Sequence, residues 1–353
     1  MNNNYLVIMA GGVGSRFWPA STAEKPKQFL DMLGTGETLL QHTVKRFEGI
    51  CGAEHILVVT SAKYVDLVKE QVPSLLNENI LAEPCARNTA PCIAYATYKI
   101  RKQNPQANIV VSPADHLIVD VELFKEEVNR ALVFSEANKA ILTMGIQPHR
   151  PETGYGYIQT SDKNADIAKV AAFKEKPQLA VAESYLAEGG YYWNAGIFIY
   201  RAEVMIDALE KYNRGLAAIF MGIENKLGTT EEQSVIEEVF PTCESISIDY
   251  SVMEKADNLF VQKATFSWSD LGTWTSLWER CKKVDAHENS SSAPLTKFYE
   301  STATLVQTET IEKVVVQGLH DYIVVESNGV LLICAKQEEQ RIKQFVADVE
   351  SAG

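Results

Sequence analysis

The 353-residue chain lacks the features that mark membrane-spanning, nucleic-acid-binding and zinc proteins. It has no apolar run of about 18 residues, the length that crosses a membrane as a helix. Its net charge of −13 disfavours nucleic acid as a partner, because nucleic-acid-binding surfaces carry an excess of Lys and Arg. The cysteines include no C-x-x-C pair, so neither a zinc site nor a disulfide framework is expected: Cys51, Cys85, Cys92, Cys243, Cys281 and Cys334.

The start of the chain, Met-Asn-Asn-Asn, lacks the charged and apolar pattern of a secretory signal. Together with the scattered cysteines, this predicts a cytoplasmic protein with no membrane partner. Apolar residues make up 46% of the chain and charged residues 22%, as in ordinary globular proteins. The length allows one large α/β domain and a small appendage.

A glycine-rich segment near the start is the most informative part of the sequence. The apolar run Tyr5–Met9 has the length and branching of a buried parallel strand, and it leads into Ala10-Gly-Gly-Val-Gly-Ser-Arg16. Glycines permit a tight turn and let backbone N–H groups approach a ligand closely. Such a loop alone is typical of an ordinary strand-to-helix turn, but Arg16, Lys25 and Lys27 add fixed positive charge to it. The combination predicts a polyphosphate site.

Two common phosphate-binding motifs are absent. The P-loop pattern G-x-x-x-x-G-K-[ST] does not occur, and the dinucleotide pattern G-x-G-x-x-G fails at its third glycine, which is Phe17. Pro19 also argues against a helix that begins directly after the turn. Arg16 and Lys27 are the candidates for neutralising a triphosphate, whereas Lys25 is expected to be a solvated surface lysine.

Further motifs follow the glycine loop along the chain: Lys25-Pro-Lys-Gln-Phe29, Glu83-Pro-Cys-Ala-Arg-Asn-Thr-Ala-Pro91, Ser112-Pro-Ala-Asp-His116, Pro151-Glu-Thr-Gly-Tyr-Gly-Tyr157, Phe173-Lys-Glu-Lys-Pro177, Trp193-Asn-Ala-Gly196 and Trp268-Ser-Asp-Leu-Gly-Thr-Trp274. In this order they resemble the sugar-nucleotide pyrophosphorylases, and most of all the mannose-1-phosphate guanylyltransferases. Each motif is weak evidence alone, but the ordered set is specific.

The resemblance implies an enzyme that transfers GMP from GTP to α-D-mannose 1-phosphate with Mg²⁺, giving GDP-mannose and pyrophosphate. Two alternatives stay open: the same chemistry on another sugar 1-phosphate, and a catalytically silent regulatory homologue. The resemblance also implies a homodimer, with a small C-terminal appendage that helps subunits associate. Because the sequence ends at residue 353, the cupin isomerase of longer relatives, and with it mannose-6-phosphate isomerase activity, is not expected.

Nucleotidyl transfer needs cations rather than a general base, because a sugar 1-phosphate is already mostly dianionic near neutral pH. Asp115 and Asp270 lie in tight polar turns after predicted strands and are the candidates for holding the metal. A helical pattern follows each one, so an N-cap is the alternative; the resemblance favours the metal. His116 is expected to form hydrogen bonds rather than to bind metal. The predicted catalytic residues are thus Arg16, Lys27, Asp115 and Asp270.

The predicted nucleotide-binding residues are Ala10, Gly11, Gly12, Gly14, Ser15, Arg16, Lys27, Glu83, Arg87, Asn88, Thr89 and Asp115. Within the loop Glu83–Thr89, acceptors and donors lie close together, as recognition of guanine requires. Arg87 could equally face the triphosphate, and Thr89 is expected to cap the following helix.

The predicted sugar-binding residues lie in the second half of the chain. By resemblance, Lys176 binds the phosphate of the sugar substrate and Glu175 binds sugar hydroxyls. Gly156 and Asn194 fit a sugar pocket built from amides and backbone groups. Three neighbouring aromatic residues either line that pocket or belong to the core: Tyr155, Tyr157 and Trp193.

The fold is predicted to be α/β, with a Rossmann-like nucleotidyltransferase domain and a small C-terminal β domain. Up to residue 145, strand-like and helix-like patterns alternate, which predicts βαβ units and a mixed, mostly parallel sheet covered on both faces. The glycine loop and Asp115 should then meet at the carboxyl edge of that sheet. We predict a catalytic domain over residues 1–284, a Ser/Asn-rich linker over 285–296, and a β-rich domain with a terminal helix over 297–353.

Overall fold

The computed structural model describes residues 3–352, and the chain forms two compact units that do not follow the sequence order. Unit 1 comprises the residues up to Gly11, Thr43–Ala114 and Ile118–Trp268. Unit 2 comprises Gly12–His42, Asp115–Leu117 and the residues from Ser269 onward. Most of the glycine loop therefore folds in one unit with the C-terminal segment. The division of the sequence into residues 1–284 and 297–353 stays a prediction.

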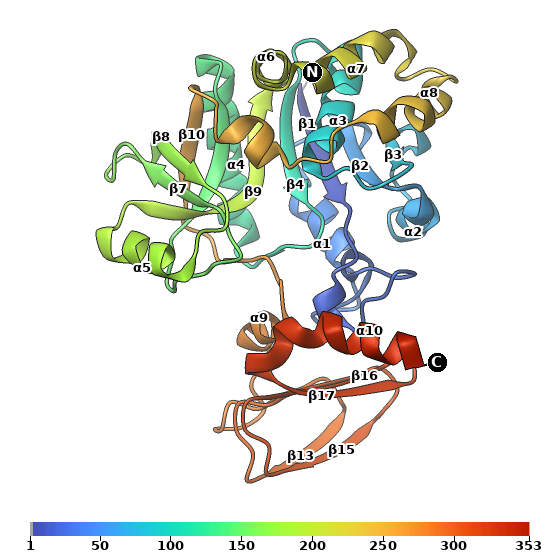
Figure 1. The fold of residues 1–353 in the computed structure, drawn as a ribbon, viewed down its shortest axis with the longest axis vertical. Helices are drawn as coiled ribbons and strands as arrows, with labels where there is room; N and C mark the ends of the chain where they lie inside the picture. Colours follow the sequence, from blue (N-terminus) through green and yellow to red (C-terminus); the bar gives the residue numbers. More distant parts are fainter. Residues whose placement is uncertain (1–2, 353) are drawn as a thin grey trace. The chain divides into compact units, whose positions relative to one another are not determined.

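Unit 1 is built on a nine-stranded sheet in the order β3-β2-β1-β4-β9-β6-β10-β8-β7 (Figure 1). Its strands are β1 (Asn4–Ala10), β2 (Ile56–Ser61), β3 (Ile80–Glu83), β4 (Asn108–Pro113), β6 (Ile141–Ile146), β7 (Tyr157–Thr160), β8 (Ile167–Lys174), β9 (Tyr191–Arg201) and β10 (Leu259–Ala264). The first four strands pair in parallel. β9 lies antiparallel between β4 and β6, and β7 pairs antiparallel with β8. The predicted mixed α/β sheet is confirmed, but it is not mostly parallel, because the pairings of β7, β8 and β9 with their neighbours are antiparallel.

Helices cover both faces of this sheet. They are α2 (Val65–Gln71), α3 (Thr89–Gln103), α4 (Val121–Asn138), α5 (Leu179–Glu188), α6 (Ala202–Tyr212), α7 (Arg214–Ile223), α8 (Glu232–Val239) and a π-helical turn (Asp249–Met253). Alternate residues of β1 show why both faces are covered. Tyr5 and Val7 belong to the buried cluster that contains residues of α3, α6 and α7, whereas Leu6 and Ile8 are buried on the other face. A short apolar strand of this kind is typical of the centre of a parallel sheet.

The chain passes from one unit to the other at five points, and three of these lie in short elements: α1 (Leu39–Arg46), β5 (Leu117–Ile118) and β11 (Trp268–Ser269). The predicted metal ligands Asp115 and Asp270 lie beside β5 and β11 in the sequence. None of the helices within residues 3–352 is long and apolar enough to cross a membrane.

In unit 2, short strands alternate between two sheets. The elements are β12 (Ser290–Ser291), β13 (Leu295–Tyr299), β14 (Leu305–Thr308), β15 (Lys313–Gln317), β16 (Tyr322–Ser327), β17 (Val330–Ala335), α9 (Trp274–Arg280) and α10 (Ile342–Ala352). β12, β14 and β16 pair in parallel, β17 adds an antiparallel edge, and β13 pairs with β15. The chain thus winds as a short β-solenoid around Val306, Val316 and Val324. The predicted small C-terminal β domain with a terminal helix is present.

A buried cluster within unit 2 joins the glycine loop to the C-terminal segment. Phe17, in the 3₁₀ turn η1 (Ser15–Phe17), packs edge-on against Trp274 of α9, with ring centroids 4.9 Å apart. Ile323 and Ile342 belong to the same cluster. Figure 1 shows α10 lying along β16 and β17. The loop therefore owes part of its position to residues near the end of the described chain.

Residues 285–296, interpreted from composition as a linker, are fixed by polar side chains. Asn289 is fully buried, and its amide donates to the Asp285 carboxylate at 2.8 Å and to the Ser301 carbonyl at 2.9 Å. The Asp285 carboxylate also accepts the backbone N–H groups of His287 and Asn289. Asn and Asp side chains can replace backbone partners in turns, so this polar run encodes a defined turn rather than a loose connection.

Candidate active site

A cavity of about 300 Å³ in unit 2 brings together the predicted triphosphate and metal residues. We call it the phosphate cavity. It is lined by Gly14, Ser15, Arg16, Phe17, Lys27, Asp115, His116, Asp270, Gly272 and Lys343. These residues come from the turn after β1, from the 3₁₀ turn Lys27–Phe29, from the turns beside β5 and β11, and from α10. All four predicted catalytic residues are among them.

The glycine at position 14 is required by geometry. Its φ of +66° lies in the left-handed region, which residues with a side chain rarely adopt. A Cβ there would also lie 2.7 Å from the Lys27 Cβ, which is too close for two carbon atoms. Gly12 has a φ of +84°. Ala10 ends β1, and Gly11 connects that strand to the turn.

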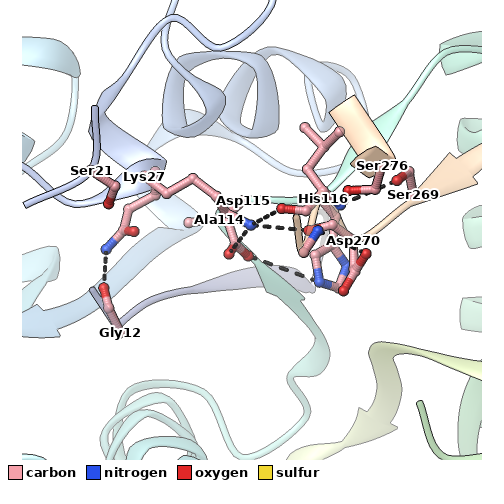
Figure 2. A network of polar contacts seen from close by, with 12 residues as sticks. Gly12, Ser21, Lys27, Ala114, Asp115, His116, Ser269, Asp270 and Ser276 are labelled. Atoms are coloured by element: carbon pink, nitrogen blue, oxygen red, sulfur yellow. Dashed lines mark hydrogen bonds and ion pairs between the residues drawn. The ribbon is translucent and has the colours of Figure 1, made fainter. Parts of the chain in front are cut away.

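Lys27 is buried in the wall of the phosphate cavity and has three partners (Figure 2). Its Nζ lies 2.8 Å from Asp115 Oδ2 and donates to the carbonyl oxygens of Asp270 at 3.0 Å and Leu271 at 2.9 Å. Leu271 has a φ of +44°, a strained conformation for a leucine. The strained turn thus presents two adjacent carbonyl groups to one ammonium group.

The other two cations of the loop are exposed. Arg16 lines the phosphate cavity and forms no ion pair within residues 3–352. Lys25 is exposed and does not line this cavity, in agreement with the expected surface lysine. Arg16 is therefore available to an anionic ligand of the cavity.

Asp115 is held in its ionised form. Burial raises its pKa, but the Lys27 ammonium and the neighbouring His116 outweigh burial and lower the pKa of Asp115 below its usual range. His116 Nε2 lies 3.9 Å from Asp115 Oδ1. The described residues contain no group of three or more His, Cys, Asp or Glu side chains that could hold a metal.

Neither predicted metal ligand caps a helix. α9 begins after Thr273, whose side chain accepts the N–H of Ser276 in a capping box, and α4 begins after Asp120. The Asp270 Oδ1 instead accepts the N–H of Gly272 at 3.0 Å, which closes a local turn. The N-cap alternative is therefore wrong for both aspartates, and both line the phosphate cavity.

The predicted sugar-binding residues lie together in unit 1, and we call Gly156, Glu175, Lys176 and Asn194 the sugar cluster. A Cβ added at Gly156 would lie 2.6 Å from Glu175 Oε2 and 3.5 Å from Asn194 Cβ, so Gly156 lies directly beside these two side chains. Lys176 Nζ lies 2.6 Å from Glu175 Oε1. Burial lowers the pKa of Lys176, but the Glu175 carboxylate outweighs burial and raises that pKa above its usual range. The backbone of Lys176 is strained, with a φ of +46°, as is common at ligand sites.

Asp249 contacts the sugar cluster but was not among the predicted residues. Asn194 Nδ2 donates to Asp249 Oδ1 at 3.1 Å, while Asn194 Oδ1 accepts from Thr143 Oγ1 at 2.8 Å and from the N–H of Gly196 at 3.1 Å. These three bonds fix the orientation of the Asn194 amide. Burial, with the charge of Glu175, raises the pKa of Asp249 to about 6. Asp249 begins a π-helical turn, and such turns occur frequently at functional sites.

The aromatic residues around the sugar cluster belong mainly to the core. Trp193 and Tyr157 are 2% and 0% exposed, which favours the core alternative for both. Tyr155 is half-buried and packs edge-on against Trp193, with ring centroids 5.2 Å apart.

The predicted base-binding loop between β3 and α3 also lies in unit 1. Burial raises the pKa of Glu83, at the end of β3, to about 7, and a hydrogen bond with the Cys92 thiol opposes that shift. Oε1 of Glu83 is buried and has no hydrogen-bond partner among the described residues. A buried carboxyl oxygen without a partner costs free energy unless a ligand supplies a donor.

The other residues of this loop have separate partners. The Arg87 guanidinium donates to the carbonyl of Pro241. Asn88 has a φ of +65°, and its side-chain oxygen accepts the N–H of Thr89 at 2.8 Å. Asn88, and not Thr89, is therefore the N-cap of α3, which corrects the prediction. The Thr89 hydroxyl instead accepts the N–H of Ile248 at 2.9 Å.

Residues 5–287 match the family model described as nucleotidyl transferase. The chain is also 36% identical over 366 residues to the mannose-1-phosphate guanylyltransferase of Escherichia coli K12, and the match covers 99% of this chain and 74% of that protein. The chain belongs to the mannose-1-phosphate guanylyltransferase family of nucleotidyl transferases. Nucleotidyl transferases generally use a divalent metal ion.

Two further matches support this membership. The alginate biosynthesis protein AlgA of Pseudomonas aeruginosa is 34% identical over 357 residues, covering 98% of this chain and 72% of that protein. A crystal structure from Thermus thermophilus, described as a mannose-1-phosphate geranyltransferase, has a TM-score of 0.88 and 28% identity, with 99% of this chain and 100% of that chain covered. The family and the fold predicted from the motifs are thus confirmed.

Proposed function

We propose that this chain transfers GMP from GTP to α-D-mannose 1-phosphate, forming GDP-mannose and releasing pyrophosphate. One observation carries the proposal: the cations Arg16 and Lys27 share the phosphate cavity with the carboxylates of Asp115 and Asp270. This set suits a reaction that moves phosphate groups and whose main barrier is electrostatic repulsion. The identities of the two substrates come from the guanylyltransferase relatives.

The reaction is a displacement at phosphorus. A phosphate oxygen of mannose 1-phosphate forms a bond to the α-phosphorus of GTP, and the bond from that phosphorus to the bridging β-phosphate oxygen breaks. The electron pair of that bond leaves with pyrophosphate. No general base is needed, because the attacking phosphate is already mostly deprotonated near neutral pH. The chain's task is to position two anions and to offset their charge.

Lys27 and Arg16 both supply that positive charge, but Lys27 is buried and bonded whereas Arg16 is exposed. Lys27 is held rigidly by its carboxylate and carbonyl partners, so it costs little reorganisation when charge develops on the phosphates. Arg16 is exposed and without a counter-ion in the described chain, so it gains a partner when the triphosphate binds. The backbone N–H groups of Gly11, Gly12 and Ser15 would add donors to the phosphate oxygens.

The phosphate cavity also fits Mg²⁺, the metal that we propose. Asp115 and Asp270 offer carboxylate oxygens, which are the ligands that Mg²⁺ prefers, and Asp115 is held ionised. When bound, the ion would neutralise phosphate charge and help to orient the reacting groups.

Recognition of the sugar and of the base is assigned to unit 1. Lys176 would bind the phosphate of mannose 1-phosphate, while Glu175 and the fixed amide of Asn194 would bind hydroxyls. Glu83 has a buried oxygen that lacks a donor, and the N1 and N2 groups of guanine are donors. Asn88 and Arg87 stay candidates for donating hydrogen bonds to the acceptor O6 of guanine.

A substrate panel tests the proposal. The protein with Mg²⁺ is incubated with each of the four nucleoside triphosphates and a set of sugar 1-phosphates, and pyrophosphate release is measured. We expect release with GTP and mannose 1-phosphate. Preference for another sugar would support the same chemistry on a different substrate. GTP binding without release from any pair would support the silent regulatory homologue.

We also infer, from the family resemblance, that the enzyme is a cytoplasmic homodimer. Sedimentation at several protein concentrations tests the assembly, and a monomer at all of them would contradict it.

A further inference from the structure

Lys343 lines the phosphate cavity together with Arg16 and Lys27, although no motif surrounds it in the sequence. It lies on α10, at the far end of the chain from the glycine loop, but within the same compact unit. Lys343 is exposed, and its amino group forms no hydrogen bond or ion pair within residues 3–352. Lys343 is therefore a solvated lysine in the lining of the phosphate cavity.

The packing of α10 explains how Lys343 reaches this place. Ile342 is fully buried in the cluster that contains Phe17, and Phe345 and Val346 pack against the same cluster. Residues at spacings of three and four share one face of a helix, so these three side chains fix the rotation of α10. Lys343 follows the anchored Ile342 directly, which places it beside the turn that carries Arg16.

The charges around the cavity favour an anion at Lys343. Lys27 already neutralises Asp115 and donates to two carbonyl groups. Arg16 and Lys343 are the lining cations that have no counter-ion in the described part of the chain. Two such cations beside a glycine turn suit a ligand with several negative charges in a row.

We propose that Lys343 binds the β- and γ-phosphates of GTP and, once formed, the pyrophosphate product. The inference rests on the proposed function for the identity of the triphosphate. The phosphate group of a sugar 1-phosphate is the alternative ligand for Lys343. The triphosphate is favoured because Lys343 shares its cavity with the glycine turn, whereas the sugar cluster has its own cation, Lys176. The C-terminal helix thereby becomes part of the nucleotide site rather than of assembly alone.

Kinetics of three variants test the inference. Lys343→Ala removes the charge, Lys343→Arg restores it, and Lys313→Ala removes an exposed lysine of β15 in the same unit that does not line the cavity. We expect Lys343→Ala to raise KM for GTP, and for pyrophosphate in the reverse reaction, by roughly 10-fold to 100-fold. KM for mannose 1-phosphate should hardly change. Lys343→Arg should recover most of the loss, and Lys313→Ala should match the wild type.

Binding measurements separate this inference from the proposed function. Inorganic pyrophosphate is titrated calorimetrically onto each variant in the absence of any sugar phosphate, and far-ultraviolet circular dichroism checks that each is folded. Weaker binding in Lys343→Ala alone supports the inference even if the substrate panel shows no turnover. Equal pyrophosphate affinity in Lys343→Ala and Lys313→Ala overturns it, as does a rise in KM confined to mannose 1-phosphate.

Discussion

Lys27 and Asp115 form an ion pair in the phosphate cavity, with Nζ and Oδ2 2.8 Å apart. The lysine side chain is 5% exposed and the aspartate side chain 31%, so the pair faces the cavity through its carboxylate. The same ammonium also donates to the backbone carbonyl groups of Asp270 and Leu271. A ligand or metal that binds Asp115 must therefore share that carboxylate with a lysine that is anchored elsewhere.

Replacing Lys27 should cost both activity and stability. Lys27→Met leaves Asp115 and two carbonyl groups without their donor. We expect turnover to fall roughly 10²–10³-fold and the free energy of unfolding to fall by about 1–3 kcal/mol. Steady-state kinetics and urea denaturation measure the two effects. Lys25→Met is the matched control on the same loop, and equal turnover in both variants would contradict the role of Lys27.

Asp115 and Asp270 should act as one metal-binding pair. Asp115→Asn and Asp270→Asn each remove one negative charge while keeping the shape of the side chain. We expect weaker Mg²⁺ activation, a collapse in turnover that high Mg²⁺ partly restores, and a double variant hardly worse than either single one. Magnesium titrations of activity provide the measurement. Asp348→Asn, an exposed aspartate on α10, is the control, and near-normal activity in Asp270→Asn would rule out the pair.

Arg16 and Lys176 should separate chemistry from sugar binding. Arg16 lines the phosphate cavity of unit 2 and Lys176 belongs to the sugar cluster of unit 1. We expect Arg16→Ala to lower kcat roughly 10²-fold, and Lys176→Ala to raise KM for mannose 1-phosphate with a smaller change in kcat. Initial rates at varied concentrations of both substrates distinguish the two patterns. The reverse pattern would exchange the roles assigned to the two loops.

The buried Glu83 carboxyl should make stability depend on pH. Burial raises its pKa from 4.5 to about 7, so below pH 4.5 the group is protonated in both the folded and the unfolded chain. Between those values the unfolded chain loses the proton first, and folding becomes less favourable as pH rises. Glu83→Gln should therefore raise the free energy of unfolding by about 1–3 kcal/mol at pH 8 and by much less at pH 5. Thermal or urea unfolding at both pH values measures this, with the exposed Glu78→Gln as control. An equal effect at both pH values would refute the cause given.

Asp249 should position Asn194 for the sugar. Asp249→Ala removes the acceptor of the Asn194 amide and leaves only the two bonds to its oxygen. We expect KM for mannose 1-phosphate to rise roughly 10-fold, with KM for GTP unchanged. Asp249→Asn keeps an oxygen acceptor and should lose less. The exposed Asp207→Ala serves as control, and a rise in both KM values would point to a general loss of structure instead.

Regular alternation made the parallel half of the sheet predictable. The apolar runs that became β1, β2, β3 and β4 alternate with helix-like segments, and this alternation predicts βαβ units. The glycine loop and Asp115 were each predicted to follow a strand and to meet at the carboxyl edge of the sheet, whereas the pairing of β1 with β4 was not predicted. Strand direction was harder to predict, since β9 is apolar along most of its length and no local pattern reveals its antiparallel place between β4 and β6.

Sequence reasoning missed residues whose contacts are made with elements distant in the sequence. Lys343 sits in an amphipathic helix whose pattern identifies the buried face but not the cavity beside it. Asp249 begins a π-helical turn, which has no period that a sequence reveals. Asn289 lies in a polar run that looks flexible, yet its amide is buried and bonded. In each case the decisive partner lies on another element.

The contact cluster that joins Phe17 to Ile342 has a consequence for how the protein is made. Phe17 is synthesised before Ile342, and more than 300 residues separate the two in the sequence. At about 5–20 residues per second, the glycine loop waits on the order of 20–60 s for that partner. Throughout this interval the nascent chain lacks part of the packing that holds the glycine loop in the phosphate cavity.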